Sequence, residues 1–323
     1  MPASGETAED ISIASVVVKP GILLGGDLNI VSPTAEYDSA FLALTISSGA
    51  THKYLSSLAQ GKSVVHLHNA DIQSVSAKFP TKREQEKIHL LFGKIDTLIT
   101  LHQRKYEKLV NIKKSMLDKM FPPNGASVPE IRFKGFTDPW EQRKFGEVVD
   151  KYEDPVETPH DGYYRLGIRS HAKGTFHSYV EKGHELETAQ MYRVAAGNFI
   201  VNITFGWEHA VAITNESDAG KLVSHRFPQY SFHDDMLPEF FKYVIADEDF
   251  RHWLWLASPG GAGRNRVLKL DEMLNYEMVL PSKEEQQRIA AIFRNLDTLI
   301  TLHQRKLEKL QNIKKSCLEK MFV

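Results

Sequence analysis

The chain has 323 residues, of which 42% are hydrophobic, 40 are Lys or Arg, 41 are Asp or Glu, and one is cysteine. This length suits about two domains with cores of their own, and the composition is neither that of a disordered chain nor that of a collagen. No apolar run approaches the roughly 20 residues that cross a bilayer, so we expect no membrane partner. The opening residues are small and acidic, which argues against an export signal. Cys317 has no second cysteine to pair with, so a cytoplasmic protein without disulfides is expected.

The net charge of −1 hides an uneven distribution along the chain. Residues 82–122 carry 10 basic and 5 acidic side chains, and residues 283–323 carry 9 and 5. Residues 1–81 carry 4 and 7, and residues 123–282 carry 17 and 24. Two short basic segments therefore alternate with two acidic ones, and their basic faces are either solvated surface or contacts for phosphates or an acidic partner.

The two basic segments are copies of each other at an offset of 201 residues. Lys82–Pro122 and Lys283–Val323 are identical at 27 of 41 positions, and the run Asp96–Lys105 recurs unbroken as Asp297–Lys306. Each copy lacks internal proline and repeats apolar residues at heptad spacing, which predicts one long helix of about 60 Å. A helix of that length needs a partner, and the other copy is the obvious one.

We expect the two helices to pack antiparallel. The residues predicted to face each other are Ile95, Ile99, Leu109 and Ile112 on the first helix and Leu296, Ile300, Leu310 and Ile313 on the second. His102 and His303 fall in register on the same stripe, where a hydrogen-bonded polar residue can fix the pairing. A metal or catalytic role for these histidines is the less favoured interpretation.

The segments outside the helices read as α+β domains. A linker-like stretch at Pro122–Ser127 follows the first helix, and a domain at 123–281 contains apolar runs typical of strands and an aromatic helical stretch. Residues 1–81 look like a copy of the second half of this domain. Val18–Leu24 resembles Val194–Ile200, and Gly61–Pro80 aligns with Ala262–Pro281. With that alignment the counterpart of Val128–Phe176 is missing from the first domain, so the chain is expected to begin within a domain.

No catalytic, metal or cofactor motif survives inspection. Gly61-Lys62-Ser63 lacks the glycine and strand of a phosphate-binding loop, and Gly261-Ala262-Gly263 lacks the third glycine of a dinucleotide fingerprint. His66 and His68 have no third ligand in reach by sequence. We therefore expect no catalytic residues, no metal and no cofactor.

Two basic clusters remain as candidate DNA contacts, because Arg pairs bidentately with guanine and Asn with adenine. In an acidic domain, DNA binding requires such local clusters. A solvated turn is the alternative interpretation for each of them. The candidate residues are Arg165, Arg169, Lys173, Arg264, Asn265, Arg266 and Lys269.

The repeated motif Pro-(Thr/Ser)-Lys-x-Glu-Gln-x-x-Ile at Pro80–Ile88 and Pro281–Ile289 precedes Asp-Thr-Leu-Ile-Thr-Leu-His-Gln-Arg-Lys in both copies. With these motifs, and with Pro129–Phe136 followed by Trp140, the chain resembles the specificity (S) subunits of type I restriction-modification systems over its whole length. The resemblance implies mixed α/β target recognition domains that alternate with two long antiparallel coiled-coil helices. The implied boundaries are 1–81 for a partial first domain, 82–122 for the first helix, 123–281 for the second domain and 282–323 for the second helix.

The resemblance also implies function and partners. Each recognition domain would read half of a split site in double-stranded DNA, and the helices would bind methyltransferase (M) subunits, with restriction (R) subunits joining the complex. The subunit itself would be non-catalytic and would direct methylation and cleavage by its partners. Alternatives are a truncated product or half subunit that dimerises, a coiled-coil adaptor without DNA reading, and a fused nuclease or methyltransferase, for which no cofactor motif occurs.

Overall fold

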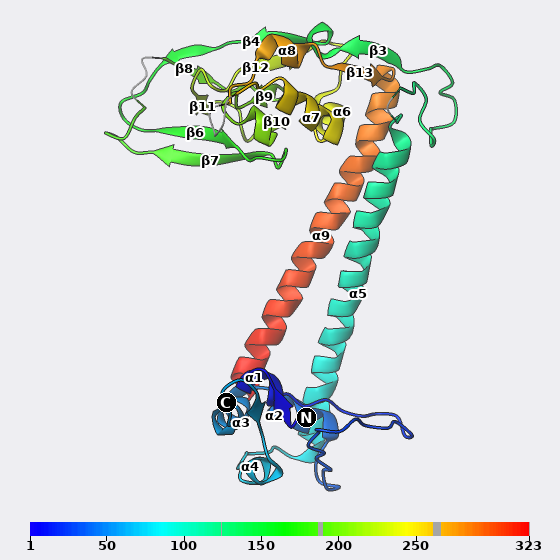
Figure 1. Ribbon diagram of the computed structural model, residues 1–323, viewed down its shortest axis with the longest axis vertical. Helices are drawn as coiled ribbons and strands as arrows, with labels where there is room; N and C mark the ends of the chain where they lie inside the picture. The colour runs from blue at the N-terminus through cyan, green and yellow to red at the C-terminus, as the bar shows by residue number, and fades with distance from the viewer. Residues whose placement is uncertain (124, 187–189, 261–265, 323) are drawn as a thin grey trace. The chain divides into compact units, whose positions relative to one another are not determined.

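The computed structural model describes residues 1–123, 125–186, 190–260 and 266–322, and the chain divides into two compact units (Figure 1). Unit 1 comprises Met1–Asn111 and Thr298–Val323, and unit 2 comprises Ile112–Asp297. Helices α5 (Lys82–Met120) and α9 (Lys283–Met321) contribute residues to both. The expected mixed fold with two long helices is confirmed. Within the described ranges, no helix is both long and apolar enough to span a bilayer.

In unit 1, α5 and α9 lie side by side and antiparallel. Nδ1 of His102 is 2.8 Å from Nδ1 of His303, and Lys314 donates to Asp96 at 2.6 Å. Asp96 precedes His102 on α5, whereas Lys314 follows His303 on α9, so the helices run in opposite directions. This confirms the antiparallel pair predicted from the repeat.

The expected helix-pairing residues are buried to different degrees. Ile95 is buried, and five others are intermediate, namely Ile99, Leu109, Leu296, Ile300 and Leu310. Ile112 and Ile313 are instead 36% and 40% exposed, so the expectation that they face the partner helix is wrong. The next residues, Lys113 and Lys314, take these places and bind Asp297 and Asp96 at 2.5 and 2.6 Å.

The remainder of unit 1 is a small helical domain. Its elements are α1 (Ala8–Ile11), α2 (Ser39–Ile46), α3 (Gly49–Leu58), α4 (Asn69–Gln73) and the antiparallel pair of β1 (Ser4–Gly5) with β2 (Val65–His66). Ile11, Leu55 and Leu67 form its core and are almost fully buried. A second cluster of Phe41 and Phe92 with Phe322 packs α2 against the two long helices, since these phenylalanines come from α2, from α5 and from the end of the chain.

Unit 2 carries two larger sheets. The five-stranded sheet has the order β5–β8–β11–β6–β7 and contains β5 (Pro155–Glu157), β6 (Tyr163–Ile168), β7 (Thr175–Val180), β8 (Gln190–Arg193) and β11 (Leu222–Val223). The four-stranded sheet has the order β10–β9–β12–β4 and contains β4 (Val149–Tyr152), β9 (Phe199–Val201), β10 (Val211–Ile213) and β12 (Gln229–Phe232).

Helices and one further strand pair complete unit 2. They are η1 (Phe145–Glu147), η2 (Gly206–Glu208), α6 (Pro238–Val244), α7 (Glu248–Leu256), α8 (Leu270–Leu274), and the pair of β3 (Glu141–Lys144) with β13 (Glu277–Leu280). The core is aromatic and includes Phe145, Phe199, Phe240 and Phe250. Phe293 of α9 is fully buried in the same cluster, so the beginning of this long helix is part of the domain core.

A buried glutamine anchors the start of each long helix. Gln85 donates to the carbonyl of Pro80 at 2.9 Å and accepts from the backbone amide of Asp38, the N-cap of α2, at 2.9 Å. Gln286 makes the same two bonds, at 3.0 Å to the proline carbonyl before α9 and 2.9 Å to the amide of Leu237, the N-cap of α6. The glutamine of the Glu-Gln motif therefore joins the start of each long helix to a short helix, α5 to α2 in unit 1 and α9 to α6 in unit 2.

Other hydrogen bonds also recur in the two units. The amide of Leu67 donates to the carbonyl of Ala3 at 2.9 Å, and the amide of Leu268 donates to that of Ile203 at 2.8 Å. The short helices that follow these donors, α4 and α8, lie 201 residues apart in sequence. Residues 1–80 of unit 1 thus correspond to residues 201–281 of unit 2, at offsets that differ by one or two residues along the segment.

This correspondence corrects the alignment of Val18–Leu24 with Val194–Ile200. Gly21, Gly197 and Gly220 all have a left-handed backbone, with φ of 77°, 79° and 78°. Two positions of unit 2 therefore match the pattern of a glycine before an apolar run. The shared hydrogen bonds select the second one, so Gly21 corresponds to Gly220.

The burial pattern predicts which side chains of the long helices stabilise the fold most. Phe293→Ala should lower the free energy of unfolding by about 3–5 kcal/mol, because it removes a fully buried ring. Leu109→Ala should cost less than about 2 kcal/mol, because this side chain is only half-buried. Urea unfolding of both variants tests the ranking, which an equal loss for the two would contradict.

The histidine pair predicts a pH dependence of stability. Burial lowers the pKa of His303, and the neighbouring His102, Lys105 and Lys306 lower it further. A histidine whose pKa is lower in the folded state stabilises fully above its unfolded value of about 6.5, and this contribution is lost as the pH falls below it. We expect the free energy of unfolding to decrease from pH 7.5 to pH 5. His209, whose pKa is lowered by burial, acts in the same direction.

The variant His303→Gln separates the contribution of His303 from that of His209, since it removes only the titrating group in the helix pair. Its pH dependence between 5 and 7.5 should be shallower than that of the wild type, as measured by unfolding at each pH. Identical slopes for the two proteins would show that His303 is not coupled to folding.

Candidate nucleic-acid interface

One short loop of unit 2, residues 203–209 around η2, is the hub of the candidate interface. Its backbone is bonded to three neighbouring segments. Ile203 donates to Arg226 at 3.0 Å and accepts from Leu268 at 2.8 Å. On the other side, the amides of His171 and Ala172 donate to the carbonyls of residues 208 and 209 at 3.0 and 2.9 Å. Both sequence segments that were predicted to bind DNA therefore approach this loop, the first with residues 171 and 172 and the second with residue 268.

The turn after β6 has an unusual backbone. His171 and Ala172 have φ of 61° and 48°, values that non-glycine residues rarely adopt. The hydrogen bonds to the 203–209 loop hold this conformation, and Ser170 adds one from its hydroxyl to Glu208 at 2.8 Å. Strained backbone of this kind concentrates at functional sites. The exposed side chains of His171 and Lys173 are presented from a fixed turn.

The hairpin that carries this turn is locked from its other side by a buried carboxylate. Asp218 is fully buried and accepts from Thr175 at 2.9 Å, while His177 lies 2.7 Å from the same oxygen. The second oxygen of Asp218 accepts from the backbone and side chain of Asn215 at 2.9 and 2.7 Å. These bonds hold β7, and with it the β6–β7 hairpin, in place beside the hub.

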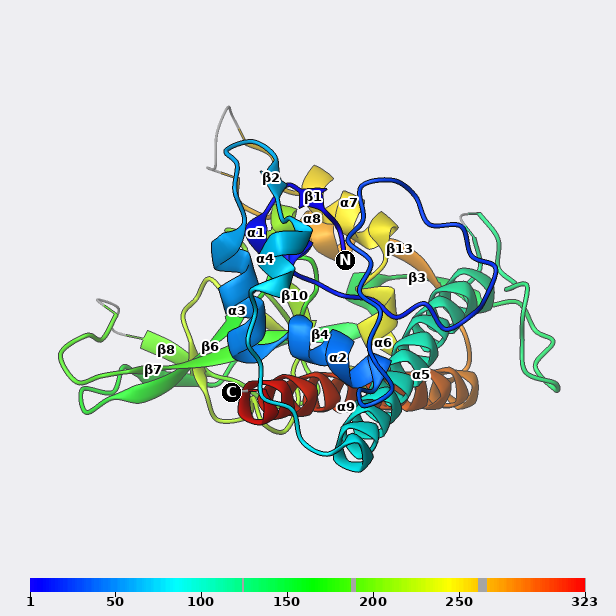
Figure 2. The same ribbon diagram turned by 90° about the horizontal axis from the view of Figure 1, so that it is seen from below.

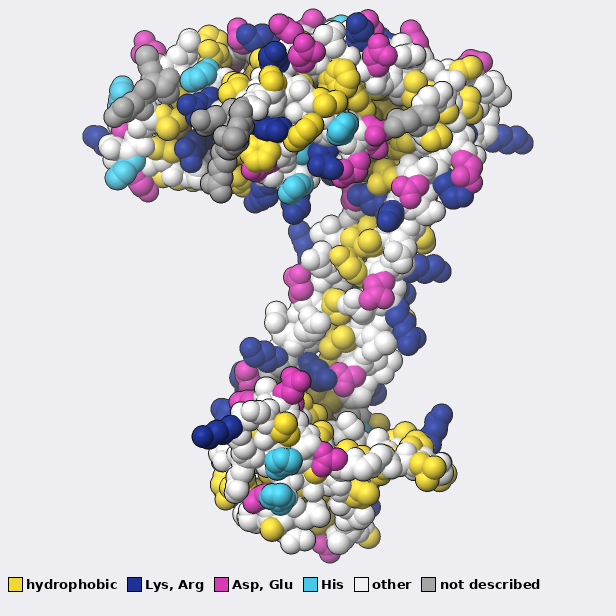
Figure 3. All heavy atoms as spheres, viewed as in Figure 1, with side chains coloured by type: hydrophobic (Ala, Val, Ile, Leu, Met, Phe, Trp, Pro, Cys, Tyr) yellow, Lys and Arg dark blue, Asp and Glu magenta, His cyan; other side chains and the backbone are white. Residues whose placement is uncertain are grey.

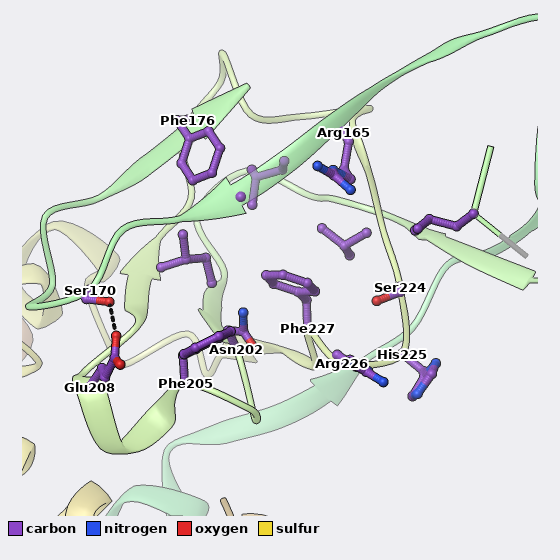
Figure 4. A pocket seen from close by; sticks show the side chains of 15 residues that line it. Arg165, Ser170, Phe176, Asn202, Phe205, Glu208, Ser224, His225, Arg226 and Phe227 are labelled. Carbon is purple, nitrogen blue, oxygen red and sulfur yellow. Dashed lines mark hydrogen bonds between the residues drawn. The ribbon is translucent and has the colours of Figure 1, made fainter. Parts of the chain in front are cut away.

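A cleft of about 630 Å³ opens between β6, the hub and the segment 224–227 (Figure 4). Phe227 lies among the lining side chains, with Arg165 of β6 on one side and Asn202 and Phe205 on another. Phe205 and Phe176 are 43% and 40% exposed, which is unusual for such large apolar rings. The cleft thus combines open aromatic faces with basic side chains.

The basic groups of the cleft are available to a ligand. Arg165 and Arg226 line it, and neither has an ion-pair partner among the described residues. His225 lies next to Arg226 and is exposed. The one acidic lining residue, Glu208, is engaged by Ser170. Arginine and histidine donors beside open rings suit phosphates and base edges.

The structure places the predicted residues in different roles. Arg165 lines the cleft, whereas Arg169 stacks on the ring of Phe176 at 5.2 Å and donates to the carbonyl of Thr175. Lys173 is exposed on the strained turn. Of the second cluster, Arg264 and Asn265 lie outside the described residues.

The remaining two residues of that cluster lie beside the hub. Arg266 stacks over the exposed ring of Trp255 at 4.7 Å, and Lys269 is exposed at the start of α8. Through Leu268, this segment is bonded to the hub loop. Arg266 and Trp255 therefore form a second basic and aromatic surface next to the cleft.

Sequence reasoning missed Phe205, His225 and Arg226. The dipeptide His225-Arg226 lies between two apolar runs and was indistinguishable from any polar turn. Its place in the cleft depends on the bond from Ile203 to Arg226, which joins residues 23 positions apart. The sequence did contain an aromatic residue, Phe205, within Thr204-Phe205-Gly206-Trp207. This residue indicated a binding site only once the structure had placed it in the hub loop.

Metal chemistry finds no support in the described ranges. There, no group of three or more His, Cys, Asp or Glu side chains is placed to hold a metal ion. His66 and His68 stack on each other with ring centroids 6.4 Å apart.

A mixed α/β domain with a basic, aromatic cleft, followed directly by long antiparallel helices, defines a class of DNA specificity proteins. The family model for the type I restriction modification DNA specificity domain matches residues 138–312. The chain belongs to this family. It is a specificity subunit, which directs a type I restriction-modification system to DNA and is itself non-catalytic.

The chain is similar to the following relative and solved structures. It is 22% identical over 312 residues to the specificity subunit of the type I restriction enzyme MjaVIII of Methanocaldococcus jannaschii, covering 92% of this chain and 72% of that protein. The fold resembles that of the S subunit of the type I system of M. genitalium, with a TM-score of 0.54, 13% identity and coverage of 89% and 73%. The HsdS subunit of Thermoanaerobacter tengcongensis is also similar, with a TM-score of 0.49, 16% identity and coverage of 89% and 70%.

Proposed function

We propose that the cleft of unit 2 reads one half of a bipartite site in double-stranded DNA. The observation that carries this proposal is a pair of arginines, Arg165 and Arg226, which have no ion-pair partner among the described residues and line the cleft with the exposed ring of Phe205. Arginine forks recognise guanine O6 and N7 in the major groove, and an apolar ring suits a thymine methyl group. The proposed supporting contacts are Arg169, Lys173, Arg266 and Lys269, with Arg264 and Asn265 as further predictions.

The charge of the domain supports a local contact. Residues 123–282 carry 17 basic and 24 acidic side chains, so the domain as a whole does not attract DNA. The basic groups in the cleft and on the strained turn provide such a domain with a local contact for phosphates. We propose recognition domains at 1–81, of partial extent, and 123–281, and spacer helices at 82–122 and 282–323.

The long helices are the proposed sites for methyltransferase subunits. The identical run shared by the two helices carries two exposed leucines in each copy, Leu98 and Leu101 on α5 and Leu299 and Leu302 on α9, each 43–46% exposed. Equal surfaces on antiparallel helices present the same contact twice. These equal surfaces favour the binding of two copies of one partner, the methyltransferase subunit. Restriction subunits would join through the methyltransferase subunits in a cytoplasmic complex.

A coiled-coil adaptor that makes no DNA contact is the second candidate, because the helices alone provide the repeated surface. It leaves the cleft of unit 2 and its free arginines without a role. Self-association of the chain stays a separate prediction.

Removing the cleft arginines should weaken DNA recognition. We expect Arg165→Ala and Arg226→Ala each to lower the preference for the cognate sequence by about 1–3 kcal/mol if the residue reads a base, or to weaken binding to all sequences alike if it contacts phosphate. Fluorescence anisotropy on cognate and scrambled duplexes at two salt concentrations distinguishes these cases. Lys151→Ala, outside the cleft, is the matched control, and unchanged binding by the double variant would reject the cleft as the DNA site.

The repeated leucines predict a stepwise loss of partner subunits. Replacing Leu98 and Leu101 by Asp should remove one methyltransferase subunit, and replacing Leu299 and Leu302 as well should remove the second, because a charge on an apolar contact opposes docking. Native mass spectrometry of the assembled complex measures the stoichiometry. Ile131→Asp is an exposed apolar control outside the run, and two bound subunits in the fourfold variant would contradict the assignment.

A further inference from the structure

The exposed leucines of the two long helices continue into exposed lysines. On each helix, two leucines and two lysines follow one another at intervals of three, four and three residues, which places them in one row on one face. The row of α5 consists of Leu98, Leu101, Lys105 and Lys108, all exposed. The row of α9 consists of Leu299, Leu302, Lys306 and Lys309, also all exposed. Each row is therefore apolar in its first half and basic in its second.

The rows lie beside the seam between the helices. Each residue of a row comes one position before a residue of the seam, as Leu101 comes before His102. A step of one residue turns a helix by about 100°, so the row faces sideways from the seam. Asp96, which Lys314 bonds across the seam at 2.6 Å, comes one position after the seam residue Ile95. The ion pair and the row therefore lie on opposite sides of the helix pair.

The antiparallel repeat brings both rows to the same side of the pair. His102 contacts His303, its own counterpart, at 2.8 Å, so a two-fold axis through this contact relates the two helices within unit 1. The axis is perpendicular to the plane of the pair, so it reverses the chain direction but keeps equal positions on the same side. The helices run beside each other in two perpendicular views (Figures 1 and 2). The two rows are therefore neighbours.

Antiparallel pairing places the leucines of one helix level with the lysines of the other. Leu101 lies one residue before the central histidine of α5, and Lys306 lies three residues after that of α9. At a rise of about 1.5 Å per residue, the two positions differ by about 3 Å along the pair, which is less than one helical turn. Leu98 and Lys309 are related in the same way. The two-fold axis repeats this arrangement with the leucines of α9 and the lysines of α5.

The lysines of the rows have no acidic partner. Among the described residues, none of the four forms an ion pair. The acidic residue between the lysines of α5, Glu107, accepts from Gln103 at 2.7 Å. Its repeat on α9, Glu308, accepts from Gln304 at 3.3 Å. Lys and Arg side chains also project from the outer edges of the paired helices (Figure 3). Uncompensated positive charge thus lies beside the exposed leucines.

We propose that each methyltransferase subunit binds a composite patch, made of the leucines of one helix and the lysines of the other, through an apolar surface with an acidic border. Interfaces of this kind have an apolar centre and a polar rim, and opposite charges fix their orientation. The inference rests on the proposed docking of methyltransferase subunits to the helices. Patch 1 contains Leu98, Leu101, Lys306 and Lys309. Patch 2 contains Leu299, Leu302, Lys105 and Lys108.

The leucines favour a protein over DNA as the occupant. Phosphates of a duplex would satisfy the lysines, because such contacts are electrostatic and independent of sequence. They offer no apolar surface to leucine side chains that are 43–46% exposed. A protein surface with carboxylates around an apolar centre satisfies both halves of each patch.

The first test removes patch 1 and asks whether its lysines belong to it. Under the proposed function, the variant Leu98→Asp with Leu101→Asp binds one methyltransferase subunit. Adding Lys306→Glu and Lys309→Glu should leave the Kd of that remaining subunit unchanged, because all four substitutions lie in the same patch. Titration with the purified methyltransferase subunit, followed by native mass spectrometry, measures both stoichiometry and Kd.

The second test places the same charge reversals on the other helix. In the variant with both leucines of patch 1 replaced, Lys105→Glu with Lys108→Glu should raise the Kd of the remaining subunit about tenfold or more, because these lysines belong to patch 2. The affinity should also fall as the salt concentration rises, since salt screens the charges. Lys87→Glu with Lys320→Glu changes the charge equally at exposed lysines outside both patches, and it should leave the Kd unchanged.

The outcomes separate this inference from the proposed function. A Kd raised by Lys306→Glu with Lys309→Glu, and not by the reversals on α5, would show that each subunit binds a single helix and would overturn the composite patch. A Kd that neither pair changes would overturn it as well. Reversals that weaken duplex binding by the chain alone, and leave the Kd for the methyltransferase subunit unchanged, would assign the lysines to phosphates. Two subunits bound to the fourfold leucine variant would instead reject the docking to the helices itself.

Discussion

A helix of 39 residues with a single apolar stripe is not stable alone in water, and this constraint organises the chain. At 1.5 Å per residue, α5 and α9 are each about 58 Å long, and each buries its stripe mainly against the other. The chain meets the constraint by using one helical sequence twice in opposite directions. Polar contacts within the seam, the histidine pair and the Asp–Lys pairs, recur at the repeat offset and specify one register, as isolated polar residues do in other coiled coils.

The ends of the helices are fixed by a different kind of interaction. Gln85 and Gln286 each use both ends of their amide, with one bond before the helix and one to the N-cap of a neighbouring helix. A buried amide that lost either bond would leave an unpaired polar group, so both bonds are needed. In unit 2 the anchor lies next to Phe293, which joins the aromatic core. Helix and domain therefore share one core at this point.

Much of this organisation was predictable from the sequence. The repeat, the long helices and their antiparallel pairing follow from identity and heptad spacing. Counting strictly in steps of three and four from Phe92 also reaches Lys113 and not Ile112. The prediction chose Ile112 because it is apolar, although the heptad spacing falls on Lys113. Because the helices are repeats, the same choice produced the error at Ile313. Sequence did not show that a lysine paired with an aspartate could occupy a seam position.

The site was less predictable, for two physical reasons. Alignment of Val18 with Val194 failed because a left-handed glycine before an apolar run occurs twice in unit 2, and only hydrogen bonds distinguish the two places. The cleft was missed because Arg226 reaches it through a backbone bond to Ile203, a contact that leaves no pattern in the sequence. Arg165 could be found because it lies in a basic cluster that is close in sequence.

The hub of the interface is held by main-chain atoms. The bonds that join residues 171, 172, 226 and 268 to the loop at 203–209 all run from amide to carbonyl, and side chains add the Ser170–Glu208 bond and a contact of His209 with the carbonyl of Ile245. The side chains of His171 and Arg226 are exposed and thus carry little of the framework's stability. Exchange of His171, Lys173, His225 or Arg226 for other residues changes the chemistry presented to a ligand while the backbone frame stays the same. Such a domain can acquire a new binding preference by single substitutions without first losing its fold.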